Sequence, residues 1–338
     1  MTSLRDRARL GISVSNNDTS ISETVAIARR AESLGISEVW IPEVNHGRTG
    51  TTVAAAVAAA TNKIGIGIGV LNPFWRHPSL LAMEAATIDE LSGGRLRFGV
   101  GPSVWSLKNL GEADDRVKKP LTATVETLRI MRTLLRGEPA PETTVFPFRT
   151  DGHLDFTPLR RDLPLYVGAV NEKMLEASGE FADGVQLGAI TSPGYTRWAR
   201  GRVAVGLARA GRSDAEFDFI GNVLVSVDRD RAAARKATRP VLAYYLHRVE
   251  GVVTDHSGAD PDAIADARRA YKEVGPEAAA DRLAESLIDV FAAAGNPDDV
   301  RARLEAYVDA GLQAPLAWNV IGPEPVSALK LLAEEVWR

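Results

Sequence analysis

The sequence predicts an α/β fold, a (β/α)8 TIM barrel with insertions, and three observations carry this prediction. Eight short apolar segments are each followed by a segment with helical periodicity, which is typical of parallel strands joined by helices. Residues 63–101 form one such unit, and its strands are rich in glycine. No G-x-G-x-x-G motif follows the first strand, which disfavours the rival fold, a doubly wound sheet.

The predicted elements alternate along the whole chain, so we expect residues 1–338 to form one barrel domain. The expected strands cover 10–14, 37–41, 63–70, 96–100, 165–167, 184–187, 217–227 and 316–320. The expected helices begin near residues 22 and 78 and cover 51–61, 116–136, 172–180, 193–210, 230–246, 297–310 and 325–336. Two segments interrupt the rhythm. Proline-rich residues 139–163 are expected to form an added hairpin, and charged residues 247–296 a helical insertion without a strand.

The unit at 63–101 is the most informative part of the chain. Lys63–Val70 alternates isoleucine with glycine, which reads as a strand buried on both faces. Pro78 can open the next helix, and glycines 93 and 94 end it before the strand Leu96–Val100. Glycines at strand ends allow close backbone approach, and a barrel builds its site at those ends. The alternative is that these glycines only let the helix pack closely.

Composition excludes several classes of protein. The chain has 45% hydrophobic residues, a net charge of −4 with dispersed basic residues, and no cysteine. These values predict a soluble globular protein without disulfides, thiolate chemistry or a nucleic-acid footprint. The N-terminal sequence is charged, and the longest apolar tract, 51–60, is too short to span a bilayer. We therefore expect a cytoplasmic protein without a membrane partner.

The strand ends carry amides, hydroxyls and indoles more often than acids and bases. This pattern suits a polar, flat, phosphorylated ligand better than hydrolysis. Residues 168–171 end a strand, and a helix starting near Asn171 would direct free backbone N–H groups at an anion. The alternative is that Asn171 is an ordinary N-cap. The five histidines include no pair at helical metal-ligand spacing, so we expect no metal site. Neither a G-x-S-x-G elbow nor a P-loop is present.

The run GVLNPFWRHPSLLAMEAATIDELSGGRLRFGVGP resembles the luciferase-like monooxygenase superfamily. Within it, the chain is most similar to the coenzyme F420-dependent oxidoreductases, in the methylenetetrahydromethanopterin reductase branch. Further matching runs are AESLGISEVWIPE, KKPLTATVETLRIMRTLLRGE, LPLYVGAVNEKMLEASGEFADGVQLG and PDDVRARLEAYVDAGLQAPLAWNVIGPEP, which spread over nearly the whole chain. The resemblance implies a barrel that holds a tricyclic deazaflavin across its C-terminal mouth.

The resemblance also implies which residues hold this cofactor. The ring would rest on a bulge with a non-prolyl cis peptide, which matches the bond between Gly69 and Val70. The phosphate-bearing tail would lie against backbone after the fifth strand. The implied cofactor contacts are Ser13, Glu43, Gly69, Val70, Asn72, Gly101, Pro102, Ser103, Gly168, Ala169, Val170, Asn171, Thr191 and Ser192.

The chain departs from the family pattern at two places. Many deazaflavin relatives have Asp-His after the tryptophan of the second strand, whereas this chain has Glu43 and Val44, with His46 two residues further on. Glu43 and His46 are the candidate catalytic residues, and an ordinary solvated loop pair is the alternative. Pro102 and Ser103 stand where some dehydrogenases have a proton-donating glutamate. The sugar-phosphate or alcohol dehydrogenase role is therefore disfavoured.

The resemblance implies hydride transfer between coenzyme F420 and a small organic substrate, most simply as a reductase. Two alternatives are an FMN-dependent monooxygenase and a catalytically silent cofactor-binding barrel. The substrate would enter near Trp75, Trp105 and residues 247–296, unless these tryptophans serve rim packing or a subunit interface. A homodimer is the expected assembly.

Overall fold

A computed structural model of the chain describes residues 3–14, 19–44, 46–103, 107, 115–139, 141–148 and 153–338, with only the backbone for 115, 116 and 319–321. All strand pairs are parallel, and the neighbours run in the order β6-β5-β4-β3-β2-β1-β9-β7. A further pairing between β6 and β7 closes these eight strands into the predicted barrel. The barrel strands are β1 (Gly11–Ser13), β2 (Glu38–Ile41), β3 (Gly65–Leu71), β4 (Leu96–Val100), β5 (Leu165–Ala169), β6 (Gly184–Leu187), β7 (Asp218–Val227) and β9 (Ala314–Ile321).

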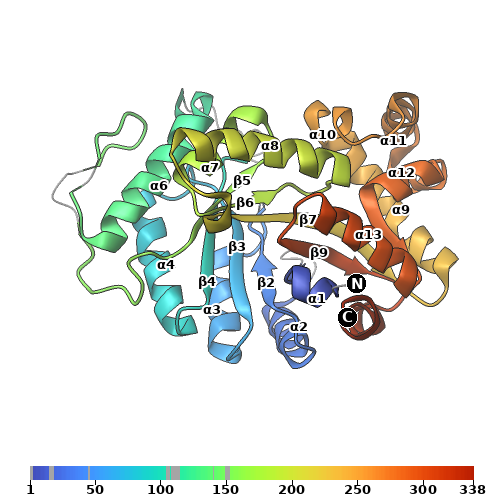
Figure 1. Cartoon of the computed structure of the whole chain (residues 1–338), viewed down its shortest axis with the longest axis horizontal. Coiled ribbons are helices and arrows are strands. Elements are labelled where there is room, and N and C mark those ends of the chain that lie inside the picture. Colours follow the sequence, from blue (N-terminus) through green and yellow to red (C-terminus); the bar gives the residue numbers. More distant parts are fainter. Residues whose placement is uncertain are drawn as a thin grey trace.

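Helices surround the strands, as Figure 1 shows. Those of the repeating units are α2 (Ile21–Ser33), α3 (Gly50–Ala60), α4 (Pro78–Ser92), α6 (Pro120–Arg136), α7 (Glu172–Phe181), α8 (Pro193–Arg209), α9 (Arg231–Arg248), α13 (Pro297–Asp309) and α14 (Pro325–Leu331). The shorter or additional ones are α1 (Leu4–Arg7), α10 (Gly251–Asp255), α11 (Pro261–Asp281), α12 (Glu285–Phe291), the 3-10 turns Asp115–Lys118 and Asp214–Glu216, and a π-helical turn, Leu332–Val336. The two chain ends lie close together, because Arg5 donates to the carbonyl of Ala333.

Local sequence signals explain where several helices begin and end. Ser20 and Glu23 form a complete capping box at the start of α2, and Asn296 forms another at α13, as predicted for Asn296. Pro78 occupies the first turn of α4, and Gly93 ends that helix with a φ of 68°. A left-handed residue is the usual C-terminal stop of a helix, and glycine adopts it without a steric penalty.

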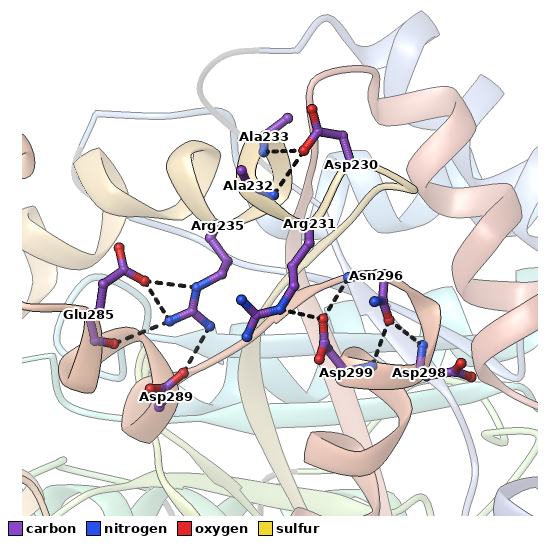
Figure 2. A network of polar contacts seen from close by, with 10 residues as sticks. All are labelled: Asp230, Arg231, Ala232, Ala233, Arg235, Glu285, Asp289, Asn296, Asp298 and Asp299. Atoms are coloured by element: carbon purple, nitrogen blue, oxygen red, sulfur yellow. Dashed lines mark hydrogen bonds and ion pairs between the residues drawn. The ribbon is translucent and has the colours of Figure 1, made fainter.

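The prediction that residues 247–296 contain no strand is wrong. β8 (Ala292–Gly295) pairs in parallel with the last four residues of β7, outside the closed barrel. The ten-residue β7 is long enough to serve both neighbours, since Asp218–Gly221 pair with β6 and Leu224–Val227 with β8. Arg235 of α9 binds Glu285 and Asp289 of α12, and Arg231 binds Asp299 of α13 (Figure 2). The pairs of Arg235 attach the extension to α9, and the pair of Arg231 joins two helices of the repeating units.

The hairpin predicted in 139–163 is also absent from the described residues, 139, 141–148 and 153–163, which contain no strand. The segment is held by side chains instead. Glu126 of α6 accepts hydrogen bonds from the backbone of Thr144, Val145 and Phe146, at 2.6 to 3.1 Å. Burial raises the pKa of Glu126, but these bonds outweigh it, and the pKa lies below its ordinary value. Further along, Arg160 pairs with buried Asp89 of α4.

The barrel interior is filled below its mouth. Trp40 and Tyr166 meet edge to face with ring centroids 5.3 Å apart, and both are at most 2% exposed. Gly67 is required beside this pair, because a Cβ there would lie 2.1 Å from the Trp40 ring. At the N-terminal end of the strands, Arg97 lies 3.3 Å from the buried carboxylate of Glu38. Burial raises the pKa of Glu38, although the arginines beside it oppose this shift.

Candidate functional site

A cavity of about 550 Å³ opens at the C-terminal end of the barrel strands. This is the end at which barrels of this type build their sites. The residues around it come from most of the barrel strands, from α7 and from the start of the extension. They include Glu43, Gly69, Val70, Gly101, Pro102, Ser103, Gly168, Ala169, Val170, Asn171, Lys173, Gln186, Asn222, Tyr245, Glu250 and Trp318.

The Val70 side chain forms one wall of the cavity and packs on glycines of two neighbouring strands. The peptide bond between Gly69 and Val70 is cis, as the resemblance implied, and the register of β3 against β4 shifts between Ile68 and Leu71. A Cβ on Gly101 would lie 2.7 Å from Val70, and a Cβ on Gly168 would lie 2.9 Å from it. Real Cβ contacts are longer than this, so both positions need glycine while Val70 lies over them. The result is a flat wall of one small side chain and backbone.

Asn72 connects the exit of β3 to the turn after β4. Its side-chain amide donates to the carbonyl of Pro102, and its Oδ1 accepts from the backbone N–H of Phe74 at 2.9 Å. Ser103, the next residue in that turn, has a φ of 39°, a left-handed value that is uncommon outside glycine. Asn72 is 3% exposed, so it supports the turn at the cavity and is not itself a wall residue.

Glu43 borders the cavity with a carboxylate that is already bound. Arg76 forms a two-pronged ion pair with it, one contact being 2.9 Å, and the backbone N–H of Gly50 donates to it at 2.8 Å. The Glu43 side chain is 4% exposed and that of Arg76 is 13% exposed. Burial alone would lower the pKa of Arg76, but the bonds to Glu43 raise it above its ordinary value. The bonds to Arg76 and Gly50 therefore hold the Glu43 carboxylate in one position at this wall.

The turn after β5 offers donors to an anion. Asn171 is the N-cap of α7 by position, but its side chain makes no capping bond. Met174 and Leu175 donate their backbone N–H groups to the carbonyl of Asn171, which leaves those of Glu172 and Lys173 for a ligand. The helix dipole favours a negative one. Lys173 in that turn also lines the cavity. These features favour the anion-site interpretation of this turn over the ordinary N-cap.

The outer wall comes from the start of the extension and from β9. Tyr245 of α9 meets Trp318 edge to face, with ring centroids 4.5 Å apart. Glu250 follows at the lip, before α10. Burial, and then the charge of Glu250, raise the pKa of Tyr195, whose hydroxyl donates to the carbonyl of Val170 at 2.7 Å. Glu250 therefore lies near the turn after β5.

Five of the predicted site residues do not line the cavity, and Asn72, described above, is one of them. Ser13 is buried below it, and His46 is exposed to solvent. Thr191 and Ser192 are fully buried and use their hydroxyls inside the protein, since Thr191 donates to the carbonyl of Asn222 and Ser192 caps α8. Trp75, expected near the substrate entrance, is partly buried and does not line the cavity either. Trp105 lies outside the described residues.

Sequence reasoning missed other wall residues. Gln186 had a signal, because it is a polar residue in the otherwise apolar strand β6. Tyr245, Glu250 and Trp318 had no local signal, since their place depends on how the extension returns to the barrel. Among the described residues, no group of three or more histidines, aspartates and glutamates could hold a metal ion. None of the helices described in this chain is both long and apolar enough to cross a membrane.

Comparison with known proteins places this barrel in a family. The model of the luciferase-like monooxygenase family matches residues 5–314. A 5,10-methylenetetrahydromethanopterin reductase of Methanolobus tindarius is 32% identical over 311 residues, which cover 91% of this chain and 94% of the relative. An F420-dependent glucose-6-phosphate dehydrogenase of Rhodococcus erythropolis is 28% identical, over 90% of this chain and 89% of the relative.

A solved structure has the same fold over the whole length. The coenzyme F420-dependent tetrahydromethanopterin reductase of Methanopyrus kandleri superposes with a TM-score of 0.89 at 28% identity, and the match covers 98% of both chains. The chain belongs to the luciferase-like monooxygenase family, and within it the chain is similar to the methylenetetrahydromethanopterin reductases. The predicted resemblance is thereby confirmed.

Proposed function

We propose that the protein is an oxidoreductase that transfers hydride between coenzyme F420, a deazaflavin, and a small organic substrate, acting as a reductase. The observation that carries the proposal is the flat wall made by Val70 over Gly101 and Gly168 at the barrel mouth. The relatives give the cofactor class, because the two named above and the Methanopyrus kandleri structure are reductases or F420-dependent enzymes by name.

The residues around the cavity fit such a cofactor. A planar ring needs a wall without protruding side chains, which the glycines and Val70 provide. An anionic tail needs backbone N–H donors and a positive charge, which the first turn of α7 and Lys173 provide. Gly168, Ala169, Val170 and Asn171 would hold the tail, and Gly69, Val70 and the turn 101–103 would hold the ring.

When bound, the deazaflavin supplies or accepts the hydride at a ring carbon. The protein then positions the cofactor and the substrate and excludes water from the cavity. Val70, Leu121 and Trp318 make much of the wall apolar. Of the two residues predicted to be catalytic, Glu43 borders the cavity and His46 does not. Glu43 is therefore the catalytic residue of the proposal.

The experiment is a titration of the purified protein with the deazaflavin and with FMN, followed by ring fluorescence. We expect the deazaflavin to bind at least about ten times more tightly, a difference of about 1.4 kcal/mol. Equal or reversed affinities would move the protein to the FMN-dependent monooxygenases. Tight binding of the deazaflavin without any hydride transfer would favour the catalytically silent cofactor-binding barrel, and no binding of either compound would contradict the proposal.

The proposal includes a homodimer. Leu80, Met83 and Leu91 are 43%, 49% and 49% exposed and project from α4 at helical spacing. Phe156 and Leu159 add exposed apolar surface from the segment that Arg160 ties to α4. A surface of this kind on one face is typical of a subunit contact. A cytoplasmic location belongs to the same proposal and is in keeping with a chain that has no cysteine.

A further inference from the structure

Two side-chain amides of neighbouring strands, β6 and β7, lie next to each other at the cavity. Gln186 of β6 is 5% exposed and lines the cavity, as does Asn222 of β7. The Gln186 Nε2 and the Asn222 Oδ1 are 3.5 Å apart. Two contacts fix their positions. A Cβ on Gly69 would lie 1.9 Å from the Gln186 Oε1, so this amide packs directly on the glycine. The backbone carbonyl of Asn222 accepts from Thr191 at 2.7 Å.

This amide pair leaves one acceptor and one donor for a ligand. A carboxamide has a carbonyl acceptor and an NH2 donor, and the mutual contact occupies one of each. The Gln186 Oε1 and the Asn222 Nδ2 have no hydrogen-bond partner among the described residues. If both amides are turned over, the free groups are the Gln186 Nε2 and the Asn222 Oδ1. In both orientations the pair therefore offers a ligand a free donor and a free acceptor.

We propose that Gln186 and Asn222 form a recognition site for an imide edge, a ring N–H flanked by carbonyl groups. The N–H of such an edge donates to one amide and a neighbouring carbonyl accepts from the other, which gives two parallel hydrogen bonds. The pyrimidine end of a deazaflavin has this edge, so the inference rests on the proposed function and assigns two further residues to its site.

The position of the pair in the barrel supports this assignment. On β3, β4 and β5 the cavity wall carries glycine at 69, 101 and 168, whereas β6 and β7 carry the two amides. Val70 covers Gly101 and Gly168, and the Gln186 amide covers Gly69. A flat ligand would therefore lie on Val70, with its polar edge facing the two amides. A ligand whose edge complements both free groups keeps them hydrogen-bonded when it displaces water from the cavity.

The test uses an analogue of the deazaflavin whose imide nitrogen carries a methyl group, which removes the donor and adds bulk. We expect the wild-type protein to bind this analogue at least about tenfold more weakly than the parent ring. In the double variant Gln186→Met and Asn222→Leu, the parent ring should bind more weakly. The penalty for the methyl group should fall there to about twofold or less.

Gln313→Met is the matched control. Its amide accepts from the backbone of Phe219 at the opposite end of the barrel, so this variant should keep the full methyl penalty. Equal affinity of the wild-type protein for the two rings overturns the proposal, and so does a penalty that persists in the double variant. The affinities of the wild-type protein for the two rings are compared without any variant. This comparison therefore still tests the proposal if the double variant does not fold. If FMN binds more tightly than the deazaflavin, the proposed function fails, and the same comparison is made with N-methylated flavin, which has the same edge.

Discussion

Val70 occupies the space that a side chain at Gly168 would need, although the two residues belong to different strands. The nearest approach of a Cβ at 168 to Val70 would be 2.9 Å. The flat wall of the cavity is therefore a joint property of β3 and β5. A change at either residue alters the surface that faces the ligand.

Gly168→Ala should destabilise the protein by about 1 to 3 kcal/mol, because the added methyl group forces Val70 to move. It should also weaken binding of the deazaflavin. Adding Val70→Ala should recover part of the stability, with a coupling of about 1 kcal/mol in a double-mutant cycle measured by denaturant unfolding. Gly201→Ala in α8 is the control, since a Cβ there meets no atom within 4 Å. Additive effects of the two changes would show that Val70 and Gly168 do not share this space.

Glu43→Gln should cost about 1 to 3 kcal/mol in the free energy of unfolding, because it leaves the nearly buried Arg76 with Glu84, 3.5 Å away, as its remaining charge partner. Adding Arg76→Met should recover part of that stability. Turnover decides the role of Glu43. If it only supports the wall, activity should return with stability in the double variant. If stability returns and activity does not, Glu43 acts on the reacting groups.

Glu126→Gln should destabilise the protein at neutral pH by about 1 to 3 kcal/mol, because the carboxylate accepts four hydrogen bonds from residues 144–146. The folded-state pKa of Glu126 is lower than its ordinary value of 4.5. Its contribution is therefore fully present above that value and is lost as the pH falls through the lowered pKa. Unfolding curves of both proteins, measured from neutral to acidic pH, should converge at the acidic end. A constant difference would contradict the assignment.

Asn171→Asp should weaken binding of the deazaflavin about fivefold, which corresponds to about 1 kcal/mol. The new charge would stand beside the anionic tail at the first turn of α7. Aspartate is also a good N-cap, so thermal stability should stay equal or increase. The affinity loss should shrink as salt is added, whereas Asn171→Ala should show no such dependence. Unchanged affinity in Asn171→Asp would place the phosphate elsewhere.

Met83→Glu should dissociate the proposed homodimer, because it places a charge in the middle of the apolar surface of α4. Light scattering coupled to size-exclusion chromatography measures the mass directly. Val326→Glu on α14 is the control, since Val326 is 67% exposed and lies outside that surface. A wild-type protein that runs as a monomer at micromolar concentration would contradict the dimer.

The sequence predicted the barrel because its signals are local. Glycines alternate with isoleucines in β3, and each barrel strand is followed by a helix that has its own apolar stripe. β8 escaped prediction because its sequence, Ala-Ala-Ala-Gly, has no strand propensity, and pairing with the long β7 decides its conformation. The anion site at Asn171 was inferred from the end of a strand, whereas the positions of Gly69, Val70 and Gly101 at the cofactor were implied by the family resemblance. Thr191 and Ser192 were not distinguishable from ligand-binding hydroxyls, because their partners, Asn222 and Ser257, are distant in sequence.

The layer of Trp40 and Tyr166 beneath the cavity has a consequence for the order of events in turnover. Trp40, Tyr166, Ile220 and Leu316 form one buried cluster in the barrel, and each is at most 2% exposed. Ligands therefore enter and leave by the same mouth. The ligand that lies on Val70 must therefore bind before the ligand above it. It can dissociate only after that second ligand has left. Steady-state kinetics should follow a compulsory sequence, with the deeper ligand first on and last off.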